Sequence, residues 1–61
     1  GEPIMKFFSH GHLPERLRVI AYPFSGLAHS LLALPRSAER SVALRKLLES
    51  KDAAVRAALE N

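Results

Sequence analysis

The fold is decided by residues 31–44, LLALPRSAERSVAL, where one apolar helical segment ends and another begins. Pro35 lacks a backbone N–H and disfavours helical geometry at the residue before it, so it ends the first segment. Ser37 is a preferred helix N-cap, and Glu39 adds an acidic side chain to the first turn of the second segment. Because the connection at 35–37 is so short, it predicts adjacent antiparallel helices, that is, a helical hairpin.

Before this connection, apolar residues recur at the three- and four-residue spacing of one helix face: Leu17, Ile20, Phe24, Leu27, Leu31 and Leu34. The pattern keeps its phase through Pro23, which removes the hydrogen bond to the Val19 carbonyl. We therefore expect one helix over residues 13–34, bent near Val19 to Pro23. Pro14 and Glu15 suit its first turn.

After the connection, residues 38–60 contain no Gly or Pro and are rich in strong helix formers, which predicts a second helix. Its apolar side chains cover a wider arc than one neighbouring helix can bury: Ala43, Leu44, Leu47, Leu48, Ala54, Val55, Ala58 and Leu59. A chain of 61 residues without cysteine also has few ways to stabilise itself alone. Both observations predict a homo-oligomer.

The N-terminal residues 1–12 hold the turn formers Pro3 and Gly11 around a short apolar run, which indicates an arm or a short helix. The sequence as a whole predicts an all-α protein with one domain over residues 1–61, made of an arm (1–12), a bent helix (13–34) and a second helix (38–60), assembled as a homo-oligomer.

Composition narrows the class of protein. Hydrophobic residues are 48% of the chain and charged residues 25%, a balance typical of globular domains. The net charge of +3 favours anionic partners, but the cations are spread from Lys6 to Arg56, so we do not expect duplex DNA binding. No apolar run approaches the roughly 18 residues of a membrane span, so we expect an intracellular protein without a membrane partner.

Catalytic and metal-binding patterns are weak. His10 and His12 form an H-x-H, but with His29 they lack the closely spaced further ligands of a structural zinc site. Ser30 adjoins His29, and sequential neighbours on a helix point in different directions. The isolated glycines form no phosphate-binding loop. We therefore expect no catalytic residue, no metal and no cofactor, and hence no enzyme.

Lys51 interrupts the apolar face of the second helix between Leu48 and Val55. A cation at such a position must extend its amine to solvent, pair with an acid, or meet an anionic ligand. Arg36 and Arg40 flank the start of the same helix, where the helix dipole favours an anion, although the interpretation favoured by the sequence is that of ordinary solvated arginines.

Several short segments, taken in order, resemble one family: residues 12–15 (HLPE), 23–24 (PF), 27–28 (LA), 34–35 (LP), 39–44 (ERSVAL) and 47–49 (LLE). The chain is similar over about residues 10–59 to the small phage anti-CBASS sponges, which sequester cyclic oligonucleotides. The resemblance implies a hexamer of helical hairpins that binds cyclic dinucleotides and cyclic trinucleotides at separate sites without cleaving them. It would thereby block anti-phage CBASS signalling in the cytoplasm of the infected bacterial host, a form of immune evasion.

The resemblance also implies site residues. A cation that contacts the trinucleotide is expected near Lys51, with Arg45 or Arg40 as the next candidates. For the dinucleotide, the family has a Tyr before the helix-opening Pro and a Lys at the bend. Here Ser9 or His10 stands at the first position, and Tyr22, Pro23 and Ser25 occupy the second. The ligand-binding residues expected from this comparison are His10, Tyr22, Ser25, Arg40, Arg45 and Lys51.

Two other functions fit the same sequence. A helical oligomerisation or assembly module would use the apolar excess to bind another protein and would bind no nucleotide. A small basic nucleic-acid-binding protein would use the dispersed arginines, and its affinity for linear DNA or RNA would fall steeply with salt.

Overall fold

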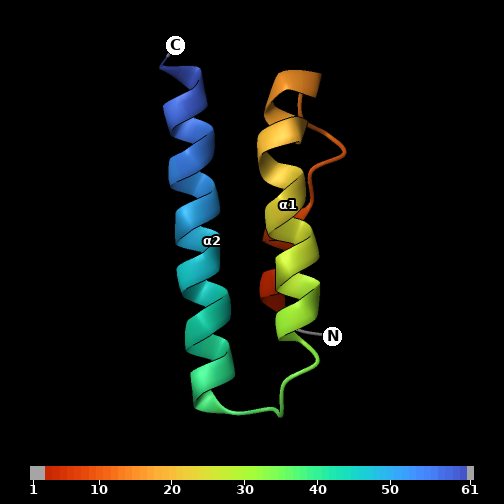
Figure 1. The fold of residues 1–61 in the computed structure, drawn as a ribbon, viewed down its shortest axis with the longest axis vertical. Helices are drawn as coiled ribbons and strands as arrows, with labels where there is room; N and C mark the ends of the chain where they lie inside the picture. The colour runs from red at the N-terminus through yellow and green to blue at the C-terminus, as the bar shows by residue number, and fades with distance from the viewer. Residues whose placement is uncertain (1–2, 61) are drawn as a thin grey trace.

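The computed structural model describes residues 3–60, and these fold into a short 3₁₀ helix and two α-helices (Figure 1). The elements are η1 (Pro3–Phe8), α1 (Glu15–Leu31) and α2 (Ala38–Leu59). Helices α1 and α2 run antiparallel, side by side, so the predicted all-α hairpin is confirmed. The first two residues of the expected arm lie outside the described residues.

The connection between the helices differs from the prediction at one end. α2 begins at Ala38 as predicted, because the Ser37 hydroxyl accepts a hydrogen bond of 3.1 Å from the Arg40 backbone N–H. α1 ends at Leu31 rather than at Leu34. The Leu34 N–H bonds to the carbonyl three residues earlier at 3.1 Å, a turn rather than an α-helical pattern. Pro35 favours this early end, because it cannot bond to the Leu31 carbonyl four residues before it and disfavours helical geometry at Leu34.

The other helix ends agree with the prediction to within two residues. α1 starts at Glu15 instead of 13, because Pro14 is the N-cap residue, with an extended ψ of 152°. The Pro14 carbonyl accepts the first two helical bonds, each of 2.9 Å. α2 ends at Leu59 rather than 60. α1 continues through Pro23 as one helix, as expected, and the bend there stays a prediction.

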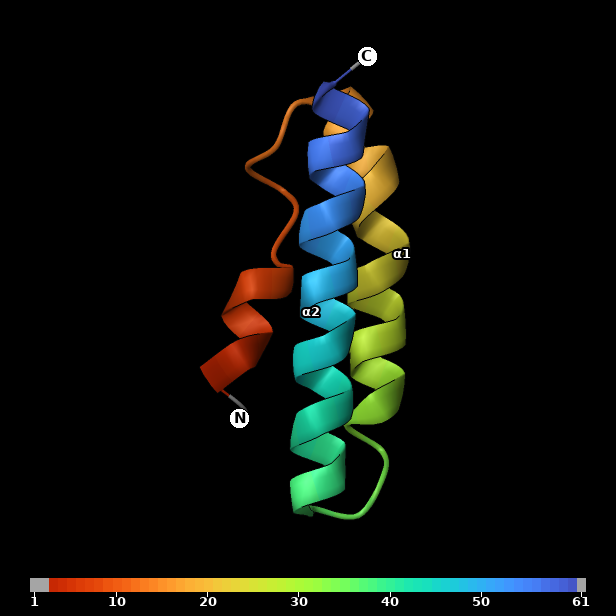
Figure 2. The same cartoon turned by 90° about the vertical axis from the view of Figure 1, so that its left-hand side faces the viewer.

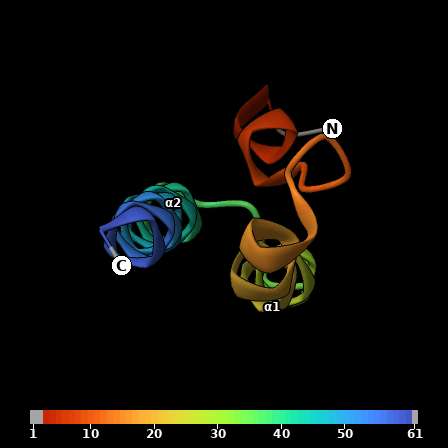
Figure 3. The same ribbon diagram turned by 90° about the horizontal axis from the view of Figure 1, so that it is seen from above.

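The core lies where the three elements meet. Phe8 of η1, Ala28 of α1 and Leu44 of α2 are buried against one another, at 2%, 0% and 0% exposure. Figures 2 and 3 show η1 beside the helix pair, so that the three elements occupy the corners of a triangle in the view from above. Partly buried apolar side chains surround this cluster: Ile4, Met5, Phe24, Leu31, Leu32, Leu47 and Leu48.

This packing changes one inference from the sequence. The broad apolar face of α2 was expected to need a second subunit, but η1 of the same chain covers part of it around Leu44, Leu47 and Leu48. No helix among the described residues 3–60 is long and apolar enough to cross a membrane.

Candidate ligand-binding pockets

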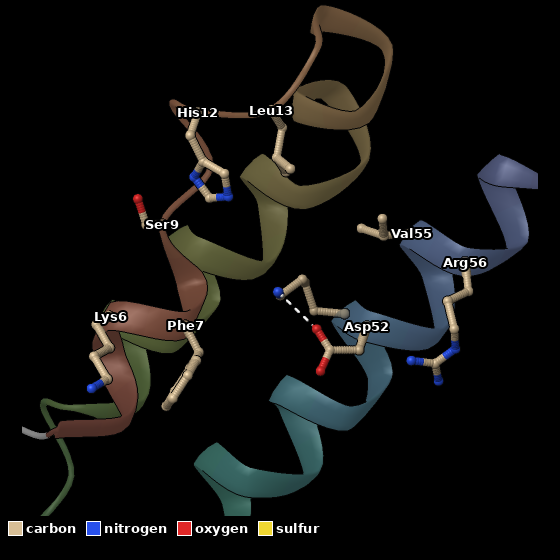
Figure 4. A pocket seen from close by; sticks show the side chains of 9 residues that line it. Lys6, Phe7, Ser9, His12, Leu13, Asp52, Val55 and Arg56 are labelled. Atoms are coloured by element: carbon tan, nitrogen blue, oxygen red, sulfur yellow. Dashed lines mark ion pairs between the residues drawn. The ribbon is translucent and has the colours of Figure 1, made fainter.

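A pocket lined by cations lies between the N-terminal segment and the C-terminal half of α2 (Figure 4). We call it the cationic pocket; its volume is about 570 Å³, within the usual range for small-molecule sites. The N-terminal segment contributes Lys6, Phe7, Ser9, His12 and Leu13, and α2 contributes Lys51, Asp52, Val55 and Arg56. The pocket is built by two segments that are more than thirty residues apart in the chain.

Lys51 is the most buried cation of this pocket, with 14% of its side chain exposed. Its Nζ lies 2.8 Å from the Asp52 Oδ1, and the dashed line in Figure 4 marks this ion pair. Pairing with an acid was one of the three expected outcomes for Lys51, and it holds the amine at the pocket wall. Asp52 is itself 45% exposed, so its carboxylate can turn toward solvent when an anion entering the pocket replaces it as the partner of the Lys51 amine.

The charge of the pocket favours an anion. The lining includes three permanent cations, Lys6, Lys51 and Arg56, and one carboxylate, that of Asp52. Neither Lys6 nor Arg56 forms an ion pair with another of the described residues. The Lys6 Nζ lies over the neighbouring Phe7 ring, 5.2 Å from its centroid. Ammonium and guanidinium groups are the usual protein donors to phosphate, so the arrangement can bind a phosphate-bearing ligand.

The walls of the cationic pocket also carry apolar surface. Phe7 is 53% exposed beside the cations, and Leu13 and Val55 line the pocket with it. An exposed aromatic ring near cations is the combination on which nucleobases stack while their phosphates are paired. The pocket thus offers both kinds of contact that a nucleotide makes with a protein.

A second pocket lies at the N-terminal end of α1, and we call it the aromatic pocket. Its volume is about 680 Å³, and it is lined by His10, Gly11, Glu15, Arg18, Val19, Tyr22 and Pro23. The His10 and Tyr22 rings meet edge to face, with centroids 5.0 Å apart and planes at 83°. The Arg18 Nη1 donates a hydrogen bond of 3.3 Å to the Leu13 carbonyl, which fixes the loop that carries His10 against α1.

The aromatic pocket leaves one polar atom unsatisfied. The His10 Nδ1 is buried and has no hydrogen-bond partner among the described residues. A buried polar atom without a partner is destabilising, so a ligand donor or acceptor that reached it would be stabilised. Tyr22 remains 64% exposed, so one face of its ring is free to contact a ligand.

The structure brings together some of the predicted site residues and separates others. His10 and Tyr22, expected to act together, share the aromatic pocket, and Lys51 lies in the cationic pocket. Ser25 lines neither pocket, and its carbonyl accepts a hydrogen bond of 2.8 Å from His29 Nδ1. Arg45 is exposed on α2 and also lines neither pocket.

Arg40 lies where it secures the end of α1. Its Nη1 donates hydrogen bonds of 3.1 Å to both the Leu32 and Leu34 carbonyls. These carbonyls follow the last turn of α1 and have no helical partner of their own. Arg40 therefore stabilises the connection of the hairpin, independently of any ligand.

Replacing Arg40 by leucine is expected to lower the free energy of unfolding by about 1–3 kcal/mol, the usual contribution of hydrogen bonds to a charged group. Arg45→Leu removes the same charge from an exposed position on the same helix, and it should change the stability by less than about 0.5 kcal/mol. Urea denaturation followed by circular dichroism measures both. Equal effects of the two substitutions would show that the bonds to the α1 carbonyls contribute nothing specific.

Sequence reasoning missed Lys6, His12 and Arg56. Arg56 lies one helical turn after Asp52, and this spacing predicts that the two are neighbours, but it did not indicate a ligand site. Lys6 and His12 belong to a segment without helical periodicity, so no pattern indicated which surface they would reach. Within residues 3–60, no group of three or more His, Asp or Glu side chains is arranged to hold a metal ion.

Comparison with known proteins finds no matching family model, no matching curated protein and no matching solved structure.

Proposed function

We propose that this protein binds and sequesters cyclic oligonucleotide second messengers without cleaving them, and so prevents CBASS effectors from being activated during phage infection. The observation that carries the proposal is the cationic pocket, where Lys51 of α2 and Lys6 of η1 line one cavity beside an exposed Phe7 ring. A cyclic oligonucleotide has a ring of phosphates with the bases pointing outward. A site that binds it therefore needs cations and apolar surface side by side.

The two pockets support separate sites for two ligand classes. The cationic pocket suits the larger phosphate ring of a cyclic trinucleotide, and the aromatic pocket, with Tyr22 and His10, suits base stacking of a cyclic dinucleotide. Each pocket is open to solvent in one chain. In a symmetric homo-oligomer, proposed here as a hexamer, threefold and twofold axes would present identical residues to ligands of matching symmetry.

Sequestration requires that the protein binds the messenger without altering it chemically. It also requires that the protein is present where the messenger is made, in the cytoplasm of the infected bacterium. Calorimetric titration with cyclic trinucleotides, cyclic dinucleotides and linear trinucleotides of the same bases tests the binding. We expect micromolar or tighter affinity for at least one cyclic class and weak binding of the linear forms. Ligand released by heating the complex should be chemically intact.

Each other result identifies a different function. Linearised ligand after heating would indicate a nuclease. Equal affinity for linear and cyclic forms, falling steeply with salt, would indicate a general nucleic-acid-binding protein. No heat with any nucleotide would overturn the proposal and favour an assembly module.

The double substitution His10→Ala and Tyr22→Ala is expected to weaken cyclic dinucleotide binding by about 10-fold or more, since stacking on one aromatic ring contributes about 1–3 kcal/mol. Trinucleotide binding should be unchanged, because neither residue lines the cationic pocket. Parallel titrations with both ligands provide the internal control. Unchanged dinucleotide affinity would remove the aromatic pocket as the site.

A further inference from the structure

Asp52 is the only acid among the described residues that line the cationic pocket. A carboxylate repels phosphate, so it weakens the binding of every anionic ligand that makes no direct use of it. Within residues 3–60 its side-chain partner is Lys51, at 2.8 Å. This pairing accounts for Asp52 before a ligand binds, because the Lys51 side chain is largely buried and a buried charge needs a partner.

The pair between Asp52 and Lys51 is one that a phosphate can exchange. The two residues are consecutive in α2, and consecutive side chains of a helix point about 100° apart. They are not at a spacing at which helical side chains face each other, so both must lean together to make the contact. A phosphate that binds the Lys51 amine therefore releases the carboxylate, which then lies beside the bound ligand without its partner.

The released carboxylate distinguishes nucleobases by its hydrogen-bonding chemistry. It has acceptors only, so it bonds to a base edge that presents donors and is repelled by ring nitrogens and carbonyl oxygens. Guanine presents two adjacent donors, the N1–H and the 2-amino group, which match the two carboxylate oxygens. Adenine, cytosine and uracil each present a single donor group beside an acceptor on the corresponding edge. Guanine is therefore the base that Asp52 favours.

The pocket places an aromatic ring across from this carboxylate. Figure 4 shows Phe7 of η1 and Asp52 of α2 on the two sides of the pocket. The Lys6 amine lies over the Phe7 ring, 5.2 Å from its centroid, yet 53% of Phe7 stays exposed. A purine can stack on the exposed part of the ring and direct its edge toward Asp52. The cations Lys6, Lys51 and Arg56 line the same pocket and remain for the phosphates.

We propose that the cationic pocket selects guanine, and that Asp52 recognises this base by accepting hydrogen bonds from its N1–H and 2-amino group while a phosphate binds the Lys51 amine. Asp52 thus has two partners in turn, Lys51 before binding and guanine after it. This inference rests on the proposed function and specifies its ligand, which is a cyclic trinucleotide with at least one guanine rather than one of adenines alone.

Calorimetric titration of the unchanged protein with three cyclic trinucleotides tests the selectivity. Each contains two adenosines, and the third nucleoside is guanosine, inosine or adenosine. Inosine lacks only the 2-amino group of guanosine, so it removes one of the two hydrogen bonds without changing the charge of the ligand. We expect the inosine ligand to bind about 10-fold more weakly than the guanosine ligand, the effect of one hydrogen bond to a charged group. The ligand with three adenosines should bind more weakly still.

Asp52→Asn separates base recognition from charge, because the two predict opposite changes. The substitution removes a negative charge, so the affinity for the ligand with three adenosines should rise by a few-fold. It also replaces one acceptor oxygen by an amino group, so the affinity for the guanosine ligand should fall by about 5-fold or more. The difference between guanosine and inosine should shrink to less than about 3-fold. Circular dichroism of the same samples checks that the helices are retained.

The matched control is Glu49→Gln, which removes the same charge from α2 at a side chain that is 60% exposed and lines neither pocket. It should leave the ratio of guanosine to adenosine affinity unchanged. Equal affinity of the unchanged protein for the three ligands, a preference for adenosine, or an unaltered ratio in Asp52→Asn would overturn the inference and leave the proposed function in place. No binding of any cyclic trinucleotide would overturn the inference together with the trinucleotide site of the proposed function.

Discussion

Replacing Leu44 by alanine is expected to lower the midpoint of thermal unfolding by roughly 10–40 °C. Leu44 is fully buried and contacts both Phe8 of η1 and Ala28 of α1, so its side chain joins all three elements. Removing a buried leucine side chain costs about 2–5 kcal/mol, and a domain of this size has a total stability of about 3–9 kcal/mol. The substitution should therefore remove much of the stability in one step.

The control for Leu44→Ala is Leu59→Ala, the same chemical change at a leucine that is 53% exposed near the end of α2. It should shift the midpoint by only a few degrees, since most of that side chain is already in water. Circular dichroism as a function of temperature measures both variants. Similar shifts in the two midpoints would mean that the cluster around Leu44 is not the core of the fold.

The hairpin could be predicted because its determinants are local. Pro35 and Ser37 act on their immediate neighbours, and the structure begins α2 at Ala38 as their chemistry requires. The end of α1 was misplaced because an apolar pattern does not show where backbone hydrogen bonds change type. The Leu34 side chain continues the pattern although its backbone already belongs to the turn.

The position of η1 could not be predicted from the sequence, and the consequences reach both the core and the site. Phe8 is buried by contacts with residues far along the chain, and no periodicity in the arm indicates this. Part of the apolar surface of α2 that was expected to need a second subunit is therefore covered by η1 of the same chain. Lys6 and His12 were missed as pocket residues for the same reason.

Three of the six predicted site residues do line a pocket. Lys51 was singled out because it interrupts an apolar face, and it lies in the cationic pocket. His10 and Tyr22 were paired through the resemblance, and their rings are in contact. Arg40 and Arg45 were predicted through the resemblance, and Arg40 also from the helix dipole. Neither argument distinguishes a residue that bonds to backbone carbonyls from one that faces solvent.

Lys51→Glu is expected to weaken cyclic trinucleotide binding by more than about 100-fold, because it removes a charge-assisted contact and adds a repulsive carboxylate. The new carboxylate would lie beside Asp52, leaving two acids against Lys6 and Arg56 in the cationic pocket. Helicity should be retained, because Lys51 and glutamate are both strong helix formers. Retention of radiolabelled cyclic trinucleotide on filters, with circular dichroism of the same samples, measures both properties.

The matched control is Lys46→Glu, which makes the same change of charge on α2 at a side chain that is 71% exposed and lines neither pocket. It should reduce binding by no more than a few-fold, the effect of the lower net charge on the ligand at long range. If both variants lose binding equally, net charge rather than the pocket holds the nucleotide. If both retain it, the trinucleotide does not occupy the cationic pocket. Lys6→Glu then tests whether the pocket as a whole, and not Lys51 alone, binds the nucleotide. It reverses a charge on the opposite wall, in η1, without altering α2.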